Sequence, residues 1–185
     1  MNTEFTLSDM NTACTAGDLN QIKYLHKHGC PWDADAYANV VEGDHLDCLI
    51  YLHKNGCPWK NLVSTFAACG HLECLIYLHE NGCPWDREVC ANAAEGHLDC
   101  LTYLHKNGCP WNEIVCLYAA HGYLDCLVYL HENGCPWNEE ICAYAAQGYL
   151  ECLKYLHKNG CPWDKQACIR AAANHPECLA YINDH

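Results

Sequence analysis

Apolar residues recur along the chain in two short stripes that alternate. The first stripe is represented by Val89, Cys90, Ala93 and Ala94, whose one-and-four spacing is typical of a helix that packs on one side. The small alanines favour close contact between helices. Polar residues that accept hydrogen bonds through their side chains precede this stripe in several copies, and as N-caps they predict where the helix begins. They are Asp86, Asn112, Asn138 and Asp164.

The second stripe follows a glycine, Gly96, which is expected to break the first helix. The spacing predicts a second helix from about Leu98 to Asn107. Its buried side is expected to consist of Leu98, Leu101, Leu104 and Tyr103. The pair Asn107-Gly108 is a strong stop signal, because glycine readily adopts the left-handed conformation that closes a helix. Pro110 prevents any continuation.

Both stripes belong to a repeat that fills the chain. The string Gly-Cys-Pro-Trp ends at Trp32, Trp59, Trp85, Trp111, Trp137 and Trp163, in steps of 27, 26, 26, 26 and 26 residues, and Asp44 accounts for the longer step. The sequence therefore predicts one domain over 1–185 with seven units, at about 8–32, 33–59, 60–85, 86–111, 112–137, 138–163 and 164–185. Two helices of about 8–10 residues are too short to be stable alone in water, so they must stack on neighbouring units. We therefore expect an all-α solenoid.

The repeat resembles a known family. The run His97–Leu104 that leads to Asn107–Cys109 resembles the second helix and turn of ankyrin repeats. The pair Ala93-Ala94 followed by Gly96-His97 matches the alanine pair and helix break of that family. The unit has 26 residues rather than the 33 of an ankyrin repeat. The missing piece falls between Trp111 and Cys116, where the family carries its β-hairpin.

The sequence thus resembles the shortened ankyrin-type repeats with Gly-Cys-Pro-Trp turns found in large DNA viruses and some protists. The resemblance implies an α-solenoid of seven ankyrin-like helix pairs with short loops in place of β-hairpins. Units 8–32 and 164–185 are expected to be end caps. In the last unit Asn174 and Pro176 replace the usual glycine and leucine, as in an atypical cap.

Charge and hydropathy narrow the possible partners and compartments. The chain carries 23 acidic and 10 basic residues, for a formal net charge of −13. This balance argues against nucleic acid or an anionic membrane as the partner, because both attractions need a basic surface. No apolar run is long enough to span a bilayer, and Met1–Met10 lacks the apolar run of a secretory signal. We therefore expect a cytoplasmic, reducing location, which is the host cytoplasm if the protein is viral.

The chain has 18 cysteines and 13 histidines, which raises the question of a metal site. Four copies of a His-x3-Cys-x6-Cys pattern are His79-Cys83-Cys90, His105-Cys109-Cys116, His131-Cys135-Cys142 and His157-Cys161-Cys168. These residue types are the usual ligands of zinc. The additional Cys100 lies about 7.5 Å along the helix axis from His105 and on a different side, so a fourth ligand is unnamed. We expect no cofactor and cysteines that fill the core, with structural Zn²⁺ as the alternative.

Disulfide bonding and catalysis are two other uses of cysteine and histidine. Disulfides between equivalent cysteines of stacked units are disfavoured, because helices pack about 8–10 Å apart and bridged Cα atoms rarely exceed about 7 Å. Bridges within a unit stay open. An enzyme is not expected, because every cysteine is copied around the repeat and no specialised nucleophile–base pair stands out. The histidines at the end of the second helix are expected to cap its last carbonyl groups, and the tryptophans to pack between units.

Function is expected where the units differ. Positions seven and ten after each Trp differ between units and lie three residues apart, on the side of the first helix opposite the apolar stripe. The ankyrin resemblance implies that first helices line the concave side of the stack. We therefore expect a non-catalytic scaffold that binds another protein through this side. The candidate partner-binding residues are Asn39, Phe66, Asn92, Leu117, Tyr118, His121, Tyr144, Gln147 and Arg170. A second, less favoured column on the other helix is Ile50, Ile76, Thr102, Val128 and Lys154.

Overall fold

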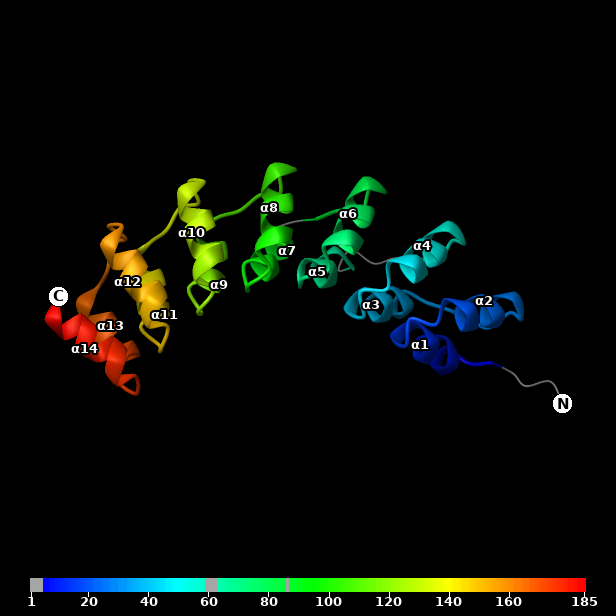
Figure 1. Ribbon diagram of the computed structural model, residues 1–185, viewed down its shortest axis with the longest axis horizontal. Coiled ribbons are helices and arrows are strands. Elements are labelled where there is room, and N and C mark those ends of the chain that lie inside the picture. Colours follow the sequence, from blue (N-terminus) through cyan, green and yellow to red (C-terminus); the bar gives the residue numbers. More distant parts are fainter. Residues whose placement is uncertain (1–4, 59–62, 86) are drawn as a thin grey trace. The chain divides into compact units, whose positions relative to one another are not determined.

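The structure is a computed structural model that describes residues 5–58, 63–85 and 87–185, with the backbone alone for residues 63, 66, 67 and 87. The chain forms two compact units, Met1–Trp85 and Asp86–His185, and from here on a single pair of helices is called a repeat. The described residues are helices and connecting turns without a strand. The chain is thus an all-α repeat solenoid of stacked helix pairs, as expected (Figure 1).

The helices alternate in chain order between the first and the second helix of a repeat. In the first unit they are α1 (Leu7–Thr15), α2 (Leu19–Lys27), α3 (Asp35–Glu42), α4 (Leu46–Lys54), α5 (Val63–Ala68) and α6 (Leu72–Glu80). In the second unit they are α7 (Arg87–Ala93), α8 (Leu98–Lys106), α9 (Glu113–Ala119), α10 (Leu124–Glu132), α11 (Glu139–Ala145), α12 (Leu150–Lys158), α13 (Lys165–Ala171) and α14 (Pro176–Asp184).

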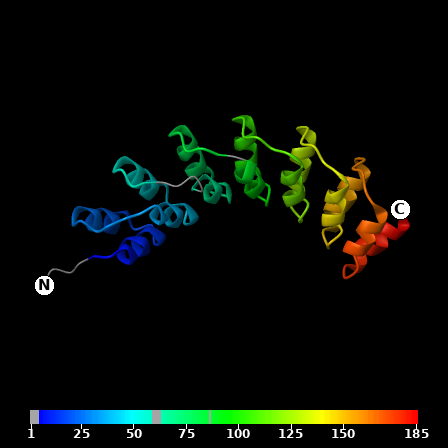
Figure 2. The ribbon, with the colours of Figure 1, turned by 180° about the vertical axis from the view of Figure 1, so that it is seen from behind.

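Within each unit, like helices stack on like helices. In the first unit α1 packs on α3 and α3 on α5, while α2 packs on α4 and α4 on α6. The second unit repeats this arrangement, with α7, α9, α11 and α13 in one row and α8, α10, α12 and α14 in the other. Where the structure describes it, as between α8 and α9, α10 and α11, and α12 and α13, an extended connection runs from a second helix to the next first helix (Figure 2). These connections lie at the positions where the ankyrin resemblance implied short loops in place of β-hairpins.

The predicted N-caps are confirmed where the structure describes them. The side chains of Asn112 and Asn138 accept hydrogen bonds from the backbone N–H groups of Ile114 and Glu140. Asp164 accepts two such bonds, at 2.8 and 3.1 Å. Each cap satisfies a donor that the first turn of a helix leaves free. Asp86 lies outside the described residues.

The second helices end in the glycine turn that the sequence predicts. In α8 the N–H of Cys109 bonds to the carbonyl of Leu104, and the N–H of Gly108 bonds to that of His105. With Gly108 at a φ of 78°, this is a Schellman motif. The helix ends at Lys106, and Asn107 caps it through Nδ2, which donates to the carbonyl of Tyr103 at 2.8 Å. The predicted capping by His105 is wrong, because the side chain of Asn107 bonds to the carbonyl of Tyr103 while His105 Nδ1 bonds to the hydroxyl of Tyr129.

The buried side of the second helix differs slightly from the expectation. Leu101 and Leu104 are fully buried, and so is Cys100, at 1 % exposed. Leu98 and Tyr103 are half-buried. The second helices α4, α6, α8, α10 and α12 thus each contribute two leucines and one cysteine to the core.

Glycine is required at the break between the two helices. Gly122 has a φ of 105°, which L side chains rarely adopt. A Cβ atom at this position would lie 3.0 Å from the ring of Tyr149 in the next repeat. In the first unit Asp44 takes up the corresponding left-handed conformation with a φ of 56°. Aspartate tolerates that conformation better than most residues do.

Candidate functional site

The histidines at the end of the second helix join neighbouring repeats. His105 Nδ1 lies 2.9 Å from the hydroxyl oxygen of Tyr129, which belongs to the next repeat. Its ring stacks on Trp111 with ring centres 3.9 Å apart, and Tyr129 meets the same Trp edge-on. Burial lowers the pKa of His105, which favours the neutral ring. The same His–Tyr pair recurs as His26–Tyr51, His53–Tyr77, His131–Tyr155 and His157–Tyr181.

The cysteines of the His-x3-Cys-x6-Cys sets, which were the alternative zinc ligands, contact other thiols and backbone carbonyl groups. The neighbouring thiol of Cys135, at the end of the same repeat, raises the pKa of Cys116, and that of Cys161 raises the pKa of Cys142. Cys135 also donates to the backbone carbonyl of Asn112 at 3.3 Å. In the residues that the structure describes, no three His, Cys, Asp or Glu side chains gather as they would around a metal ion. The thiols therefore contact each other and helix-start carbonyls.

The two early repeats keep this arrangement with other residues. Tyr37, which stands in place of the first-helix cysteine, is fully buried and donates its hydroxyl to the carbonyl of Cys57 at 3.0 Å. Ser64 is 1 % exposed and donates to the carbonyl of Pro84 at 2.9 Å. Either hydroxyl satisfies its need for a partner inside the core. At this position tyrosine and serine thus each donate to a carbonyl of the turn that ends the repeat.

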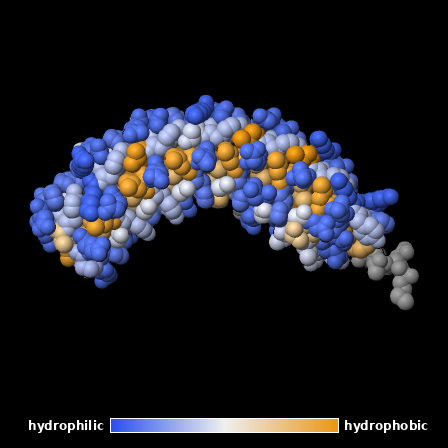
Figure 3. Space-filling view, in the orientation of Figure 1, coloured by the Kyte–Doolittle hydropathy of each residue, from blue (hydrophilic) through white to orange (hydrophobic). Residues whose placement is uncertain are grey.

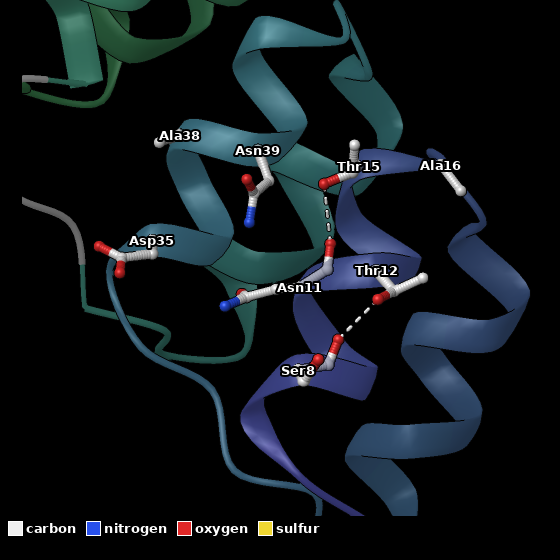
Figure 4. A pocket seen from close by; sticks show the side chains of 8 residues that line it. All are labelled: Ser8, Asn11, Thr12, Thr15, Ala16, Asp35, Ala38 and Asn39. Carbon is white, nitrogen blue, oxygen red and sulfur yellow. Dashed lines mark hydrogen bonds between the residues drawn. The ribbon is translucent and has the colours of Figure 1, made fainter.

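The side of the first helices that faces away from the second helices carries shallow hollows between successive repeats. We call this surface the first-helix face. In the first unit a hollow of about 930 Å³ lies between α1 and α3 (Figure 4). Its lining residues are Ser8, Asn11, Thr12, Thr15, Ala16, Asp35, Ala38 and Asn39. The side chains of Asn11 and Asn39 extend into it from the two helices (Figure 4). The Asn11 Oδ1 atom is buried without a hydrogen-bond partner.

The second unit has two further hollows on this face, and they carry aromatic and acidic side chains. The hollow between α7 and α9 has a volume of about 280 Å³, and the hollow between α11 and α13 about 320 Å³. The first is lined by Glu88, Ala91, Asn92, Ile114 and Tyr118. The second is lined by Glu139, Glu140, Ala143, Tyr144, Gln147, Asp164 and Ala167. Tyr118 and Tyr144 are 38 % and 37 % exposed, so their rings are open to a ligand.

Five of the nine candidate partner-binding residues line one of these hollows. They are Asn39, Asn92, Tyr118, Tyr144 and Gln147. His121 lies beside the last hollow, where its ring meets Tyr144 edge-on with centres 5.4 Å apart. Leu117 is half-buried and Arg170 is exposed at the end of α13. Phe66 falls in α5, but its side chain lies outside the described residues.

Some lining residues were missed by the sequence analysis. Asp35, Glu88, Ile114 and Glu140 all stand three positions after a Trp. That position precedes position seven by four residues and therefore shares its side of the helix. Its variation from acid to isoleucine was a usable signal.

The second unit lies in the left half of Figure 3, where its apolar side chains form patches bordered by hydrophilic residues.

No helix among the described residues is long and apolar enough to cross a membrane, and the second helices have nine residues each.

Comparison with known proteins supports the fold. No protein-family model matches the chain, and no curated protein matches it in sequence. Among solved structures, the ankyrin repeat domain of human ASB11 is similar over 83 % of this chain and 84 % of its own, with 20 % identity and a TM-score of 0.68. The pentatricopeptide repeat protein PPR10, solved with an 18-nucleotide RNA, has 17 % identity and a TM-score of 0.42 over 96 % of this chain and 34 % of its own. The chain therefore has an ankyrin-like repeat fold.

Proposed function

We propose that this chain is a non-catalytic scaffold that binds another protein through its first-helix face. The main observation behind the proposal is that residues which differ between repeats line the hollows of this face. Positions seven and ten after each Trp, which differ between repeats, supply five residues that line the three hollows. The inner positions that build the stack are repeated nearly unchanged.

Two tyrosines are the expected anchors of this interaction. Tyr118 and Tyr144 are exposed, and each borders a hollow beside carboxylate or carboxamide groups. Tyrosine is enriched at binding hot spots because it buries a large rigid ring and still offers a hydroxyl. The ankyrin-like fold agrees with this role, since a stack of repeats presents an extended surface.

The test is a selection of binding partners from a displayed peptide library, followed by affinity measurement with variants. The double variant Tyr118→Ala/Tyr144→Ala is expected to weaken the selected ligands at least tenfold, about the effect of losing hot-spot side chains. The control is Tyr24→Ala, which removes an even more exposed tyrosine (49 %) from the second helix α2. Thermal melts of all variants should stay close to that of the parent chain.

The proposal would be overturned by either of two results. One is ligands that bind the double variant as tightly as the parent chain. The other is ligands that lose affinity only with the α2 control, which would move the binding surface to the second helices.

A further inference from the structure

The hollow between α11 and α13 differs from the other two in charge. Three carboxylates line it, from Glu139, Glu140 and Asp164, and no lysine, arginine or histidine does. The hollow between α1 and α3 has a single carboxylate among small polar side chains. The α11–α13 hollow therefore favours a cation more strongly than the α1–α3 hollow does.

Two of the three carboxylates are available to a ligand. Glu139 and Glu140 are exposed, and neither has a side-chain hydrogen bond or an ion pair among the described residues. Asp164 is already engaged, because its Oδ1 accepts from the N–H groups of Gln166 and Ala167. It contributes charge to the hollow, while the two glutamates can rotate toward a ligand.

An aromatic ring stands beside these carboxylates. Glu140 and Tyr144 are four residues apart on α11 and hence on the same side of the helix. The ring of His121 from the preceding repeat meets Tyr144 edge-on, with centres 5.4 Å apart, and supports its position. Ala143 and Ala167 are small and leave the space of about 320 Å³ open. Gln147 adds a carboxamide oxygen that accepts hydrogen bonds.

We propose that this hollow binds an arginine side chain of the partner protein. A guanidinium group is planar, stacks on aromatic rings and carries five N–H donors, so it can meet Tyr144, both glutamates and Gln147 together. The ammonium of lysine offers three donors at one point and is more strongly hydrated. This proposal rests on the proposed function, because it assigns chemistry to one part of the first-helix face.

The experiment is an NMR titration of the ¹⁵N-labelled full chain with N-acetyl-arginine amide. The matched probes are N-acetyl-citrulline amide, which has the same shape without charge, and the corresponding lysine derivative. The arginine probe is expected to shift amide signals of residues 139–147 and 164–167 in a saturable way. The citrulline probe should leave them unchanged, and the lysine probe should bind more weakly.

Variants separate the hollow from the general acidity of the chain. Glu139→Gln/Glu140→Gln is expected to weaken arginine binding about fivefold or more, as loss of two exposed ion pairs implies. Its control, Asp125→Asn/Glu132→Gln, removes the same charge from exposed positions of α10 and should have little effect. Tyr144→Leu should weaken binding, whereas Tyr144→Phe should retain most of it. All five substituted positions are exposed, so folding is expected to survive.

Several outcomes would overturn the arginine site. They are the absence of localised shifts, equal shifts with citrulline, shifts spread over all acidic residues, or equal losses in the two charge variants. A lysine probe that binds better would also do so. None of these touches the proposed function, which fails instead if library ligands ignore Tyr118 and Tyr144.

Discussion

One cysteine differs from all the others in its exposure to solvent. Seventeen of the eighteen are buried, and Cys69, at the end of α5, is exposed. Burial raises the pKa of Cys14 and Cys57 to about 12 and that of Cys168 to about 11. A thiol with such a pKa is protonated near pH 7–8, and the thiolate is the reactive form. These three thiols are therefore protected both by burial and by protonation.

We accordingly expect one fast-reacting thiol in the folded chain. Titration with a chromogenic disulfide reagent should modify about one cysteine quickly, and Cys69→Ser should remove that phase. In denaturant all eighteen thiols should react. Several thiols reacting at the fast rate in the folded protein, or a fast phase that survives Cys69→Ser, would contradict this account of the core.

Residue by residue, the sequence predicted roles that depend on near neighbours. The N-caps Asn112 and Asn138 were predicted because their partners lie two residues away. The partner of His105 was not, because Tyr129 lies 24 residues on and reaches it only when repeats stack. The Cys116–Cys135 pair was missed because its members stand at opposite ends of one repeat, too far apart in sequence for local spacing to relate them.

At the scale of the elements, two glycine positions have different physical requirements. Gly108 closes α8 at a φ of 78°, and a Cβ atom there would meet nothing within 4 Å. Gly122 ends the first helix at a φ of 105°, and its Cβ atom would press on the ring of Tyr149. The first glycine is needed for its backbone conformation alone, the second also for contact between repeats.

Substitution by alanine should separate these two requirements. Gly108→Ala is expected to lower the free energy of unfolding by about 1–2 kcal/mol, the cost of a left-handed alanine. Gly122→Ala should cost about 1–3 kcal/mol more, because the methyl group also overpacks the joint. Urea denaturation measures both. Adding Tyr149→Ala should shrink the difference between them, and equal costs for the two alanines would show that the ring contact does not matter.

At the scale of the whole molecule, we attribute the stability of the stack to side-chain contacts rather than to bound metal. The histidine rings bond to tyrosines and stack on tryptophans, while Cys135 and Cys161 donate to backbone carbonyl oxygens. The protein purified under reducing conditions should therefore contain much less than one zinc ion per chain. A chelator should leave its thermal melt unchanged, and Cys109→Ala should behave as a core substitution.

Stoichiometric zinc, or a melt that falls in chelator, would restore the alternative of metal ligands. The His-x3-Cys-x6-Cys sets would then be the first place to look. The single-domain organisation over 1–185, the cytoplasmic location and the viral origin remain predictions from sequence.

The sequence by itself determined the fold class, because periodicity, caps and glycine stops act within a few residues. The 26-residue period also determined that helix pairs must stack, since each pair is too short to be stable alone. Only the tertiary structure decided which side chains meet between repeats: His105 with Tyr129, Tyr144 with His121, and Glu140 with the α11–α13 hollow. These contacts join residues of different helices or repeats, so they depend on the packing distance and rotation of neighbouring helices. Local sequence patterns do not encode those two quantities.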